Sequence, residues 1–236
     1  MLTFIKKKFL RSYKLSLTGF TLIELTISLA IMGMMMGVLL SSYPETAIRL
    51  TLVNVSHTTS LLLREAQVRG SAIDSGNTAL TEESPYGGYG VYVETNNQNN
   101  IILFNDFVDP NSPKPLGLAV GDGLYQKVAP LNETNRTVLF PSGYFVSKIC
   151  VSNDLPFVFK CNNLSSPTIN NLTVSFTRPN PQPDIYINNS SAVNFSAACI
   201  EVRSQRAPAT GHVRAIQVFN SGMIRTQTGH CDDSVL

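Results

Sequence analysis

Two hydrophobic patterns follow each other along the chain, and the first of them is continuous. From Phe20 to Leu40 the residues are mostly apolar, and Glu24 is the one charged side chain in these 21 positions. A helix of this length rises by roughly 31 Å at ~1.5 Å per residue, which is about the thickness of a bilayer's hydrocarbon core. The run therefore predicts a membrane-spanning helix over residues 20–40.

Over residues 45–70 the apolar positions recur every three or four residues instead. This stripe consists of Ile48, Leu52, Val55, Thr59, Leu62 and Ala66. It is typical of one buried face of an amphipathic helix. Pro44 predicts a kink or a turn between the two halves, and Gly70 is a suitable helix stop. Residues 20–70 are therefore expected to be helical, with the second half packed against a domain.

From Tyr86 onward the pattern changes to a period of two, which predicts a β-rich head domain over residues 71–236. Alternating segments flank the Asn-rich stretch 96–100 and predict a β-hairpin. Further strands are predicted at 124–128, 137–140, 144–151, 155–159, 172–177, 185–187, 198–203, 212–219 and 223–227. The expected fold class is α+β, with a long N-terminal helix followed by an antiparallel β-rich head.

Two of these strand pairs share a pattern at their turns. Phe140-Pro141-Ser142-Gly143-Tyr144 and Phe219-Asn220-Ser221-Gly222-Met223 each join an apolar strand to the next strand through Ser-Gly. Both segments therefore predict tight hairpins that need a positive φ at the glycine.

Charge separates the first residues from the rest. The formal net charge is +2, from 18 Lys+Arg and 16 Asp+Glu, which is too small an excess for a dedicated nucleic-acid binder. The first 19 residues hold no acidic side chain but five basic ones: Lys6, Lys7, Lys8, Arg11 and Lys14. Without these five, 13 basic residues face 16 acidic ones. Cations before an apolar span predict a cytoplasmic N-terminus, with the remainder across the membrane.

Three interpretations of this N-terminus compete. A secretory signal peptide needs a cleavage site of small residues, and Leu40-Ser41-Ser42-Tyr43 is a poor one. A plain membrane anchor explains the hydropathy alone. The third interpretation depends on the junction KLSLTGFTLIELTISLAIMG, where glycine precedes the apolar run, an aromatic residue opens it and a glutamate stands four residues further on. This junction resembles the N-terminus of type IV prepilin-like proteins, which include type IV pilins and type II secretion pseudopilins.

The resemblance implies a leader over residues 1–19. A membrane aspartyl prepilin peptidase would cut after Gly19 and methylate the new amino terminus at Phe20. Glu24 would pair with that amino terminus on a neighbouring pilin or pseudopilin subunit during filament assembly. A charge inside an apolar span costs about 2.5–3.5 kcal/mol at its centre and is usually retained for a function. A carboxylate that snorkels to the membrane edge is the alternative for Glu24.

The head domain resembles that of the H-type minor pseudopilins, through its strand-Ser-Gly-strand segments and the runs GGYGVYVET and VSFTRPNPQPDIYI. The implied function is that of a structural filament subunit in protein secretion. It would lie in the bacterial inner membrane with a periplasmic head, and an assembly platform with a separate ATPase would extrude it. The alternative is a minor pilin for DNA uptake or adhesion. Its phosphate contacts would come from Arg203, Arg206, Arg214 and Arg225, unless these are dispersed over outer faces of strands.

Cys150, Cys161, Cys199 and Cys231 all fall in the head domain. Four cysteines allow three connectivities. The favoured pairs are Cys150–Cys161, which bracket a short segment, and Cys199–Cys231, which fasten the C-terminal tail. Free buried thiols are the alternative, and no C-x-x-C spacing supports zinc.

No sequence motif supports catalysis, so neither an enzyme nor a cofactor is expected. The three histidines, His57, His212 and His230, stand apart in the sequence. Oxygen ligands for Ca²⁺ could come from Asp106, Asp109, Asn111 and Asp122, but their spacing fits no EF-hand. Solvated turn residues are the favoured interpretation of these four, and no metal site is predicted.

Overall fold

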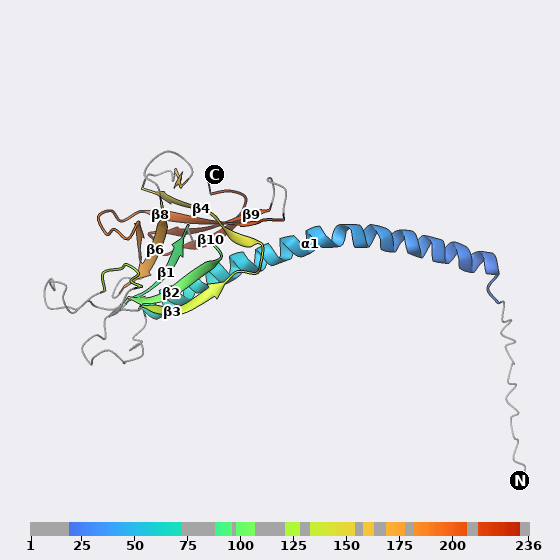
Figure 1. The fold of residues 1–236 in the computed structure, drawn as a ribbon, viewed down its shortest axis with the longest axis horizontal. Coiled ribbons are helices and arrows are strands. Elements are labelled where there is room, and N and C mark those ends of the chain that lie inside the picture. Colours follow the sequence, from blue (N-terminus) through green and yellow to red (C-terminus); the bar gives the residue numbers. More distant parts are fainter. Residues whose placement is uncertain are drawn as a thin grey trace, which may run out of the picture. The chain divides into compact units, whose positions relative to one another are not determined.

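The computed structural model describes residues 19–71, 88–95, 98–106, 121–127, 133–153, 158–162, 169–177, 182–206 and 212–231. The chain forms two compact units, Met1–Pro44 and Glu45–Leu236. We call the second one the folded unit. One long helix is followed by strands that pair antiparallel throughout (Figure 1). The predicted α+β class is confirmed at this level.

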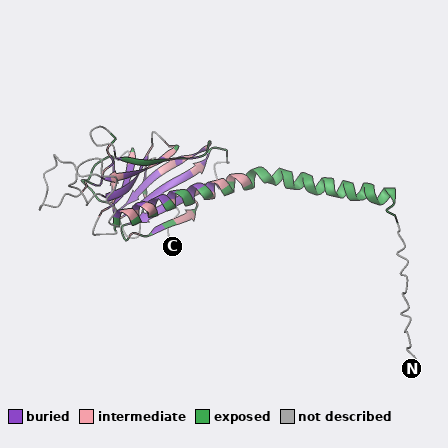
Figure 2. Cartoon of the chain, turned by 90° about the horizontal axis from the view of Figure 1, so that it is seen from below, coloured by how far each residue is buried: buried purple, intermediate pink, exposed green. Residues whose placement is uncertain are grey.

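Helix α1 runs without interruption over Leu22–Ser71. Pro44 lies inside it, so the turn considered there is wrong. Proline removes one N–H from the helical ladder, but the hydrogen bonds on either side keep the backbone helical. The side chains are exposed from Leu22 to Thr46, and buried positions begin only beyond Ala47 (Figure 2).

The strands form two five-stranded sheets. The first has the order β3-β2-β1-β6-β7, with bounds Thr134–Leu139, Asn100–Asp106, Gly88–Glu94, Asn171–Phe176 and Pro183–Ile187. The second has the order β10-β9-β8-β4-β5, with bounds Ile224–Thr228, Val213–Phe219, Ala197–Ser204, Tyr144–Ser152 and Lys160–Cys161.

The core of the folded unit lies where the stripe of α1 meets one face of each sheet. Leu63 of α1, Val174 of β6 and Ile200 of β8 belong to one cluster and are almost completely buried. Gly70 brings the last turn of α1 against β6, where an added Cβ would lie 2.3 Å from the backbone oxygen of Phe176. The predicted helix stop at Gly70 is thus also a position of close backbone approach.

The two Ser-Gly segments have similar turns but different outcomes. Gly143 and Gly222 both have positive φ, at 88° and 81°, as predicted. β9 and β10 pair through the second turn. The first hairpin is wrong, because β3 pairs with β2 whereas β4 pairs with β8 in the other sheet. The turn sequence sets the glycine conformation, but the partner of the next strand depends on tertiary packing.

Two other strand predictions differ from the structure. Residues 121–127 contain no strand, and Val128 lies outside the described residues. This segment lies over the outer face of the first sheet instead, where the rings of Tyr125 and Tyr92 are 4.6 Å apart. Of the predicted strand 155–159, only Val158 and Phe159 are described, and the strand here, β5, begins at Lys160.

Candidate functional site

The predicted processing site lies at the start of α1. Gly19 and Phe20 precede the helix and are exposed, and 77% of the Phe20 surface is accessible. Nothing lies within 4 Å of a Cβ added at Gly19. The peptide bond between these two residues is therefore open to an enzyme. Residues 1–18 of the predicted leader lie outside the described part of the chain.

The start of α1 has an N-cap that the sequence reasoning missed, and it involves the backbone of Glu24. Its backbone N–H donates to the side-chain Oγ1 of Thr21 at 3.3 Å, which makes Thr21 the N-cap of α1. A carboxylate in the first helical turn is also favoured by the helix dipole. The spacing Thr-x-x-Glu is the sequence signal of a capping box, so it was visible in the sequence. The observed cap depends on the Thr21 side chain and the backbone of Glu24, so it does not by itself explain the Glu24 carboxylate.

Hydroxyl groups in the apolar part of α1 bond to the helix itself. Thr26 donates to the carbonyl of Ile23 at 2.8 Å, and Ser28 donates to the carbonyl of Glu24 at 2.7 Å. Such bonds satisfy polar side chains where no water is present, so these residues are compatible with a hydrocarbon environment. Among the described residues, α1 is the one helix long and apolar enough to cross a membrane, and its most apolar window has no buried residue.

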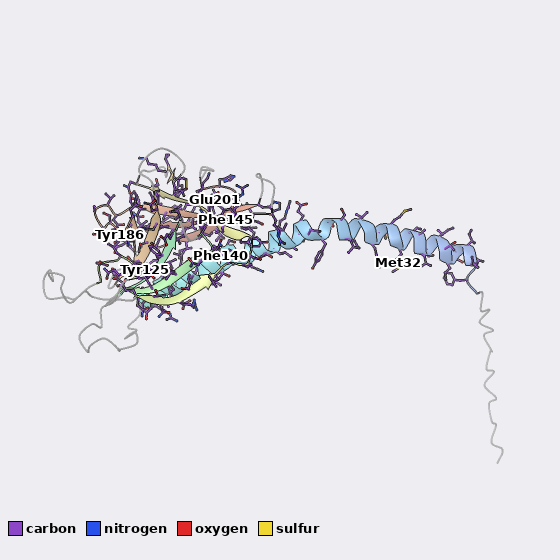
Figure 3. All side chains as sticks on the ribbon, in the orientation of Figure 1. Met32, Tyr125, Phe140, Phe145, Tyr186 and Glu201 are labelled. Carbon is purple, nitrogen blue, oxygen red and sulfur yellow. A yellow bond between two sulfur atoms is a disulfide. The ribbon has the colours of Figure 1, made fainter. Side chains whose placement is uncertain are left out.

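The exposed part of α1 offers a surface of small and flexible residues. Gly33 and Gly37 have nothing within 4 Å of an added Cβ. Met32, which Figure 3 shows extending away from the helix, and the run Met34–Met36 are more than half exposed. Small residues four apart allow close approach of another helix, and methionine adapts to an irregular partner surface.

The cysteines form two disulfides, and the favoured pairing is confirmed. Cys150 is bonded to Cys161 across β4 and β5, and Cys199 of β8 is bonded to Cys231 beyond β10. Cys150 and Cys199 are also opposite each other in the register of β4 and β8. The two disulfides therefore lie side by side on the outer face of the second sheet, and one of them fastens the end of the chain.

A buried carboxylate beside these disulfides binds two side chains. Glu201 is 1% exposed, and its oxygens accept from Ser147 at 2.7 Å and contact Nδ1 of His230 at 3.0 Å (Figure 3 labels Glu201). In a nucleophilic triad the histidine would stand between the serine and the carboxylate. Here the serine binds the carboxylate directly, so the arrangement is not that of a triad. The contact between Glu201 and His230 instead holds the C-terminal segment against β8.

Two of the four oxygen-bearing residues considered for Ca²⁺ meet at the end of the first sheet. Asp106 accepts the N–H of Gly123 at 3.0 Å, and Asp122 accepts the N–H of Leu124 at 2.9 Å in the same turn. Burial, and then the charges of Glu133 and Asp122, raise the pKa of Asp106 well above its usual range. Asp122 acts as a turn residue, and Asp109 and Asn111 lie outside the described residues. No metal-binding group of three His, Cys, Asp or Glu side chains occurs in the described ranges.

The three histidines are separate in space as well as in sequence. His57 is exposed on α1, while His212 lies 3.4 Å from Nε of Arg49 and His230 contacts Glu201. This separation gives no arrangement for shared acid–base chemistry.

The four late arginines do not form one surface. Arg203 and Arg214 lie at the end of the second sheet where β8 stops and β9 starts, and Arg206 follows in the turn after β8. Arg225 opposes Gln217 further along β9, toward Gly222, whose carbonyl binds Gln67 near the C-terminal end of α1. The structure thus places three of them at one end of the second sheet, with Arg203 and Arg214 on different faces, and places the fourth further along the sheet.

Comparisons with protein-family models, with curated proteins and with solved structures find no match. The function proposed below therefore rests on the sequence and the geometry of the chain.

Proposed function

We propose that this protein is a subunit of a type IV pilin-like filament, of the minor pseudopilin kind. The observation that carries the proposal is the junction at Gly19 and Phe20, followed directly by an exposed apolar helix that continues into a β-rich folded unit. Such a helix has two suitable environments, the bilayer before assembly and a bundle of like helices afterwards. The subunit acts mechanically, and a separate ATPase supplies the energy for assembly.

The two disulfides support the orientation in this proposal. They require an oxidising compartment, such as the bacterial periplasm. The basic residues before α1 favour a cytoplasmic start of the chain. Together these features favour insertion in the inner membrane with the folded unit in the periplasm.

The first test is the N-terminus of the protein extracted from membranes. Processing after Gly19 predicts a chain that begins with N-methylated Phe20, as measured by intact mass and N-terminal sequencing. Gly19→Val is expected to leave the precursor uncut, because a branched side chain then occupies the cleavage position. A chain that still begins at Met1 in a host with the peptidase would contradict the proposal.

The second test separates subunit pairing by the Glu24 carboxylate from the cap at Thr21. In the proposed filament its carboxylate pairs with the amino terminus of Phe20 on the next subunit, and an unpaired charge among apolar helices is costly. Glu24→Gln should therefore keep cleavage but remove most incorporation into filaments, as measured by shearing and immunoblotting.

Thr21→Ala is the matched control, because it removes the N-cap without changing a charge. The cap uses the backbone N–H of Glu24, which Glu24→Gln keeps, so capping alone predicts a loss for Thr21→Ala and none for Glu24→Gln, whereas subunit pairing predicts the larger loss for Glu24→Gln. Normal incorporation of Glu24→Gln would exclude the pairing role.

A further inference from the structure

β3 is an outer strand of the first sheet, and one of its edges is open. Among the described strands it pairs with β2 alone, and five of its six residues are exposed (Figure 1). The outer strand at the other end of the same sheet, β7, is covered instead. There the N–H of Ile185 donates to the side chain of Asn194, and the carbonyl of Ile185 accepts from the N–H of Phe195. The first sheet therefore has one covered edge and one open edge.

The open edge presents the backbone of Thr137 and Leu139. The N–H of Phe140 donates to the carbonyl of Asn99, and bonded positions alternate along an antiparallel strand, so Val138 bonds to β2 while Thr137 and Leu139 face away from it. Within the described residues, no hydrogen bond reaches the backbone of Thr137 or Leu139. An extended peptide backbone is the group that matches such a row of donors and acceptors.

A groove lies beside this edge, between β3 and α1. It has a volume of about 270 Å³ and is lined by four residues of α1 from Thr51 to Thr58 and by residues 138–141. None of the lining side chains is charged. Arg136, two residues before Val138, is held by the carboxylate of Glu65 on α1. The groove is therefore suited to an uncharged side chain.

The edge and the groove are placed for one strand to use both. Val138 packs against the core, so it faces the side of the sheet on which α1 lies. In a strand added to β3, the residue opposite Val138 would point to that same side, over the groove, and its two neighbours would bond to Thr137 and Leu139.

The edge at Thr137 and Leu139 lacks the usual protection against such pairing. Outer strands are commonly blocked by lysine, proline or a bulge. The sequence from Thr137 to Leu139 contains neither residue, and the register shift opposite Leu103 and Phe104 lies toward the other end of β3. The edge is thus open at the positions beside the groove.

A second copy of this chain does not fill the groove. Its own β3 would offer Arg136 or Val138 on the inner side of the sheet. In each copy Arg136 is bound to Glu65 and Val138 is packed against the core, so neither side chain is available to a neighbour. The groove instead fits a segment whose inward side chains are not already packed on a domain of their own.

We propose that β3 accepts an extended, uncharged segment of a partner protein as an additional strand, with an apolar side chain in the groove. The backbone of Thr137 and Leu139 supplies the hydrogen bonds, and the groove selects the side chain. Both parts of the site lie within the folded unit, so the inference does not depend on the membrane anchor or on cleavage after Gly19.

The test uses the full chain in mild detergent and the labelled peptide KTVTVTK, with binding measured by fluorescence anisotropy. When valine lies over the groove, the threonine N–H groups of the peptide point to β3 and the valine N–H groups point away from it. N-methylation of both valines should therefore preserve binding, whereas N-methylation of the three threonines should remove it. Aspartate in place of both valines should also remove binding, because an unpaired charge in an uncharged groove is costly.

Two proline variants locate the binding edge. Thr137→Pro removes an N–H that faces away from β2, and edge strands accept proline at such positions. The matched control is Thr226→Pro in β10, an outer strand of the second sheet, where the N–H also faces away from the neighbouring strand.

One backbone hydrogen bond contributes about 1 kcal/mol, which is about fivefold in binding, and the proline ring also obstructs the peptide. We therefore expect Thr137→Pro to weaken binding about tenfold or more, and Thr226→Pro to bind like the wild type. Circular dichroism checks that both variants are folded. If one is not, the two methylated peptides decide the question on the wild type alone.

Several results would overturn the inference. They are the absence of binding by both the unmethylated and the valine-methylated peptide, binding by the threonine-methylated peptide, or equal losses in the two folded proline variants. A wild type that sediments as a dimer, and as a monomer after Thr137→Pro, would assign the edge to a second copy of the chain. None of these results bears on processing at Gly19, which is measured separately.

Discussion

The two parts of α1 have the same secondary structure but opposite surroundings. From Leu22 to Thr46 the apolar side chains are exposed, whereas from Leu52 to Gly70 one face is buried against the folded unit. The exposed part is apolar on all sides, which is the pattern of a helix that lies in lipid or among other helices. The packed part is apolar along a stripe, because only that face meets the two sheets.

This difference shows that the exposed fraction of a helix in a single chain does not indicate whether its side chains are polar or apolar. Leu29 and Leu63 are the same residue type in the same helix, yet Leu29 is 60% exposed and Leu63 is completely buried. The partner of Leu63 lies in this chain. The partner of Leu29 is the membrane or another subunit under the proposed function. Matched substitutions in the two parts can therefore test the comparison directly.

The largest expected effect comes from a cavity in the packed part. Leu63→Ala should reduce the free energy of unfolding of the folded unit by about 3 kcal/mol, because it removes buried methyl groups from a close-packed core. Leu29→Ala should leave it unchanged. Urea unfolding of the full chain in detergent, followed by tyrosine fluorescence because there is no Trp, measures both.

An equal loss in the two variants would mean that both parts of α1 are stabilised by the folded unit. If Leu63→Ala lowers the free energy of unfolding only slightly, the core rearranges to fill the space of the missing side chain.

A second, smaller effect is expected from the glycines of α1. Gly70→Ala places a Cβ 2.3 Å from the backbone oxygen of Phe176 and 2.8 Å from its Cβ. Overpacking of this kind lowers the free energy of unfolding by about 2 kcal/mol. This loss is expected even though alanine has a higher helix propensity than glycine. Gly33→Ala meets nothing within 4 Å and should not destabilise the folded unit. Thermal unfolding followed by circular dichroism compares the two, and an unchanged midpoint for Gly70→Ala would show that α1 moves away from β6 easily.

Much of this comparison could be predicted from sequence, because α1 depends on local patterns. The stripe from Leu52 to Ala66 has helical spacing, and a stripe of this kind specifies which face is buried. The cap at Thr21 was also encoded locally. For the cysteines, sequence favours one pairing without excluding the other two, because only the pairing of β4 with β5 brings Cys150 opposite Cys161.

Long-range strand pairing was the part that sequence could not supply. The turn at Gly143 has the predicted conformation, but β4 leaves the sheet of β3 and joins β8, which lies far along the chain. The positions of two late arginines follow from the same pairing, because the register of β8 and β9 brings Arg203 and Arg214 to one end of the second sheet. Local patterns do not encode which strand edges will meet.

The smallest expected effect concerns two glutamates of α1 that differ in their partners. Glu65 in the packed part binds Arg69 at 2.8 Å and also Arg136 of β3, and its side chain is 25% exposed. Glu45, at the end of the exposed part, binds Arg49 one helical turn away, with both side chains at least 60% exposed. Exposed helical pairs contribute about 0.3 kcal/mol, whereas a partly buried carboxylate shared by two arginines reaches about 1 kcal/mol.

Glu65→Gln should therefore destabilise the folded unit about three times more than Glu45→Gln in urea unfolding. In 1 M salt both losses should shrink, with the larger fraction lost at Glu45 because its pair is more exposed to ions. Equal losses at low salt would mean that the contact between Glu65 and Arg136 does not stabilise the packing of α1 on the first sheet.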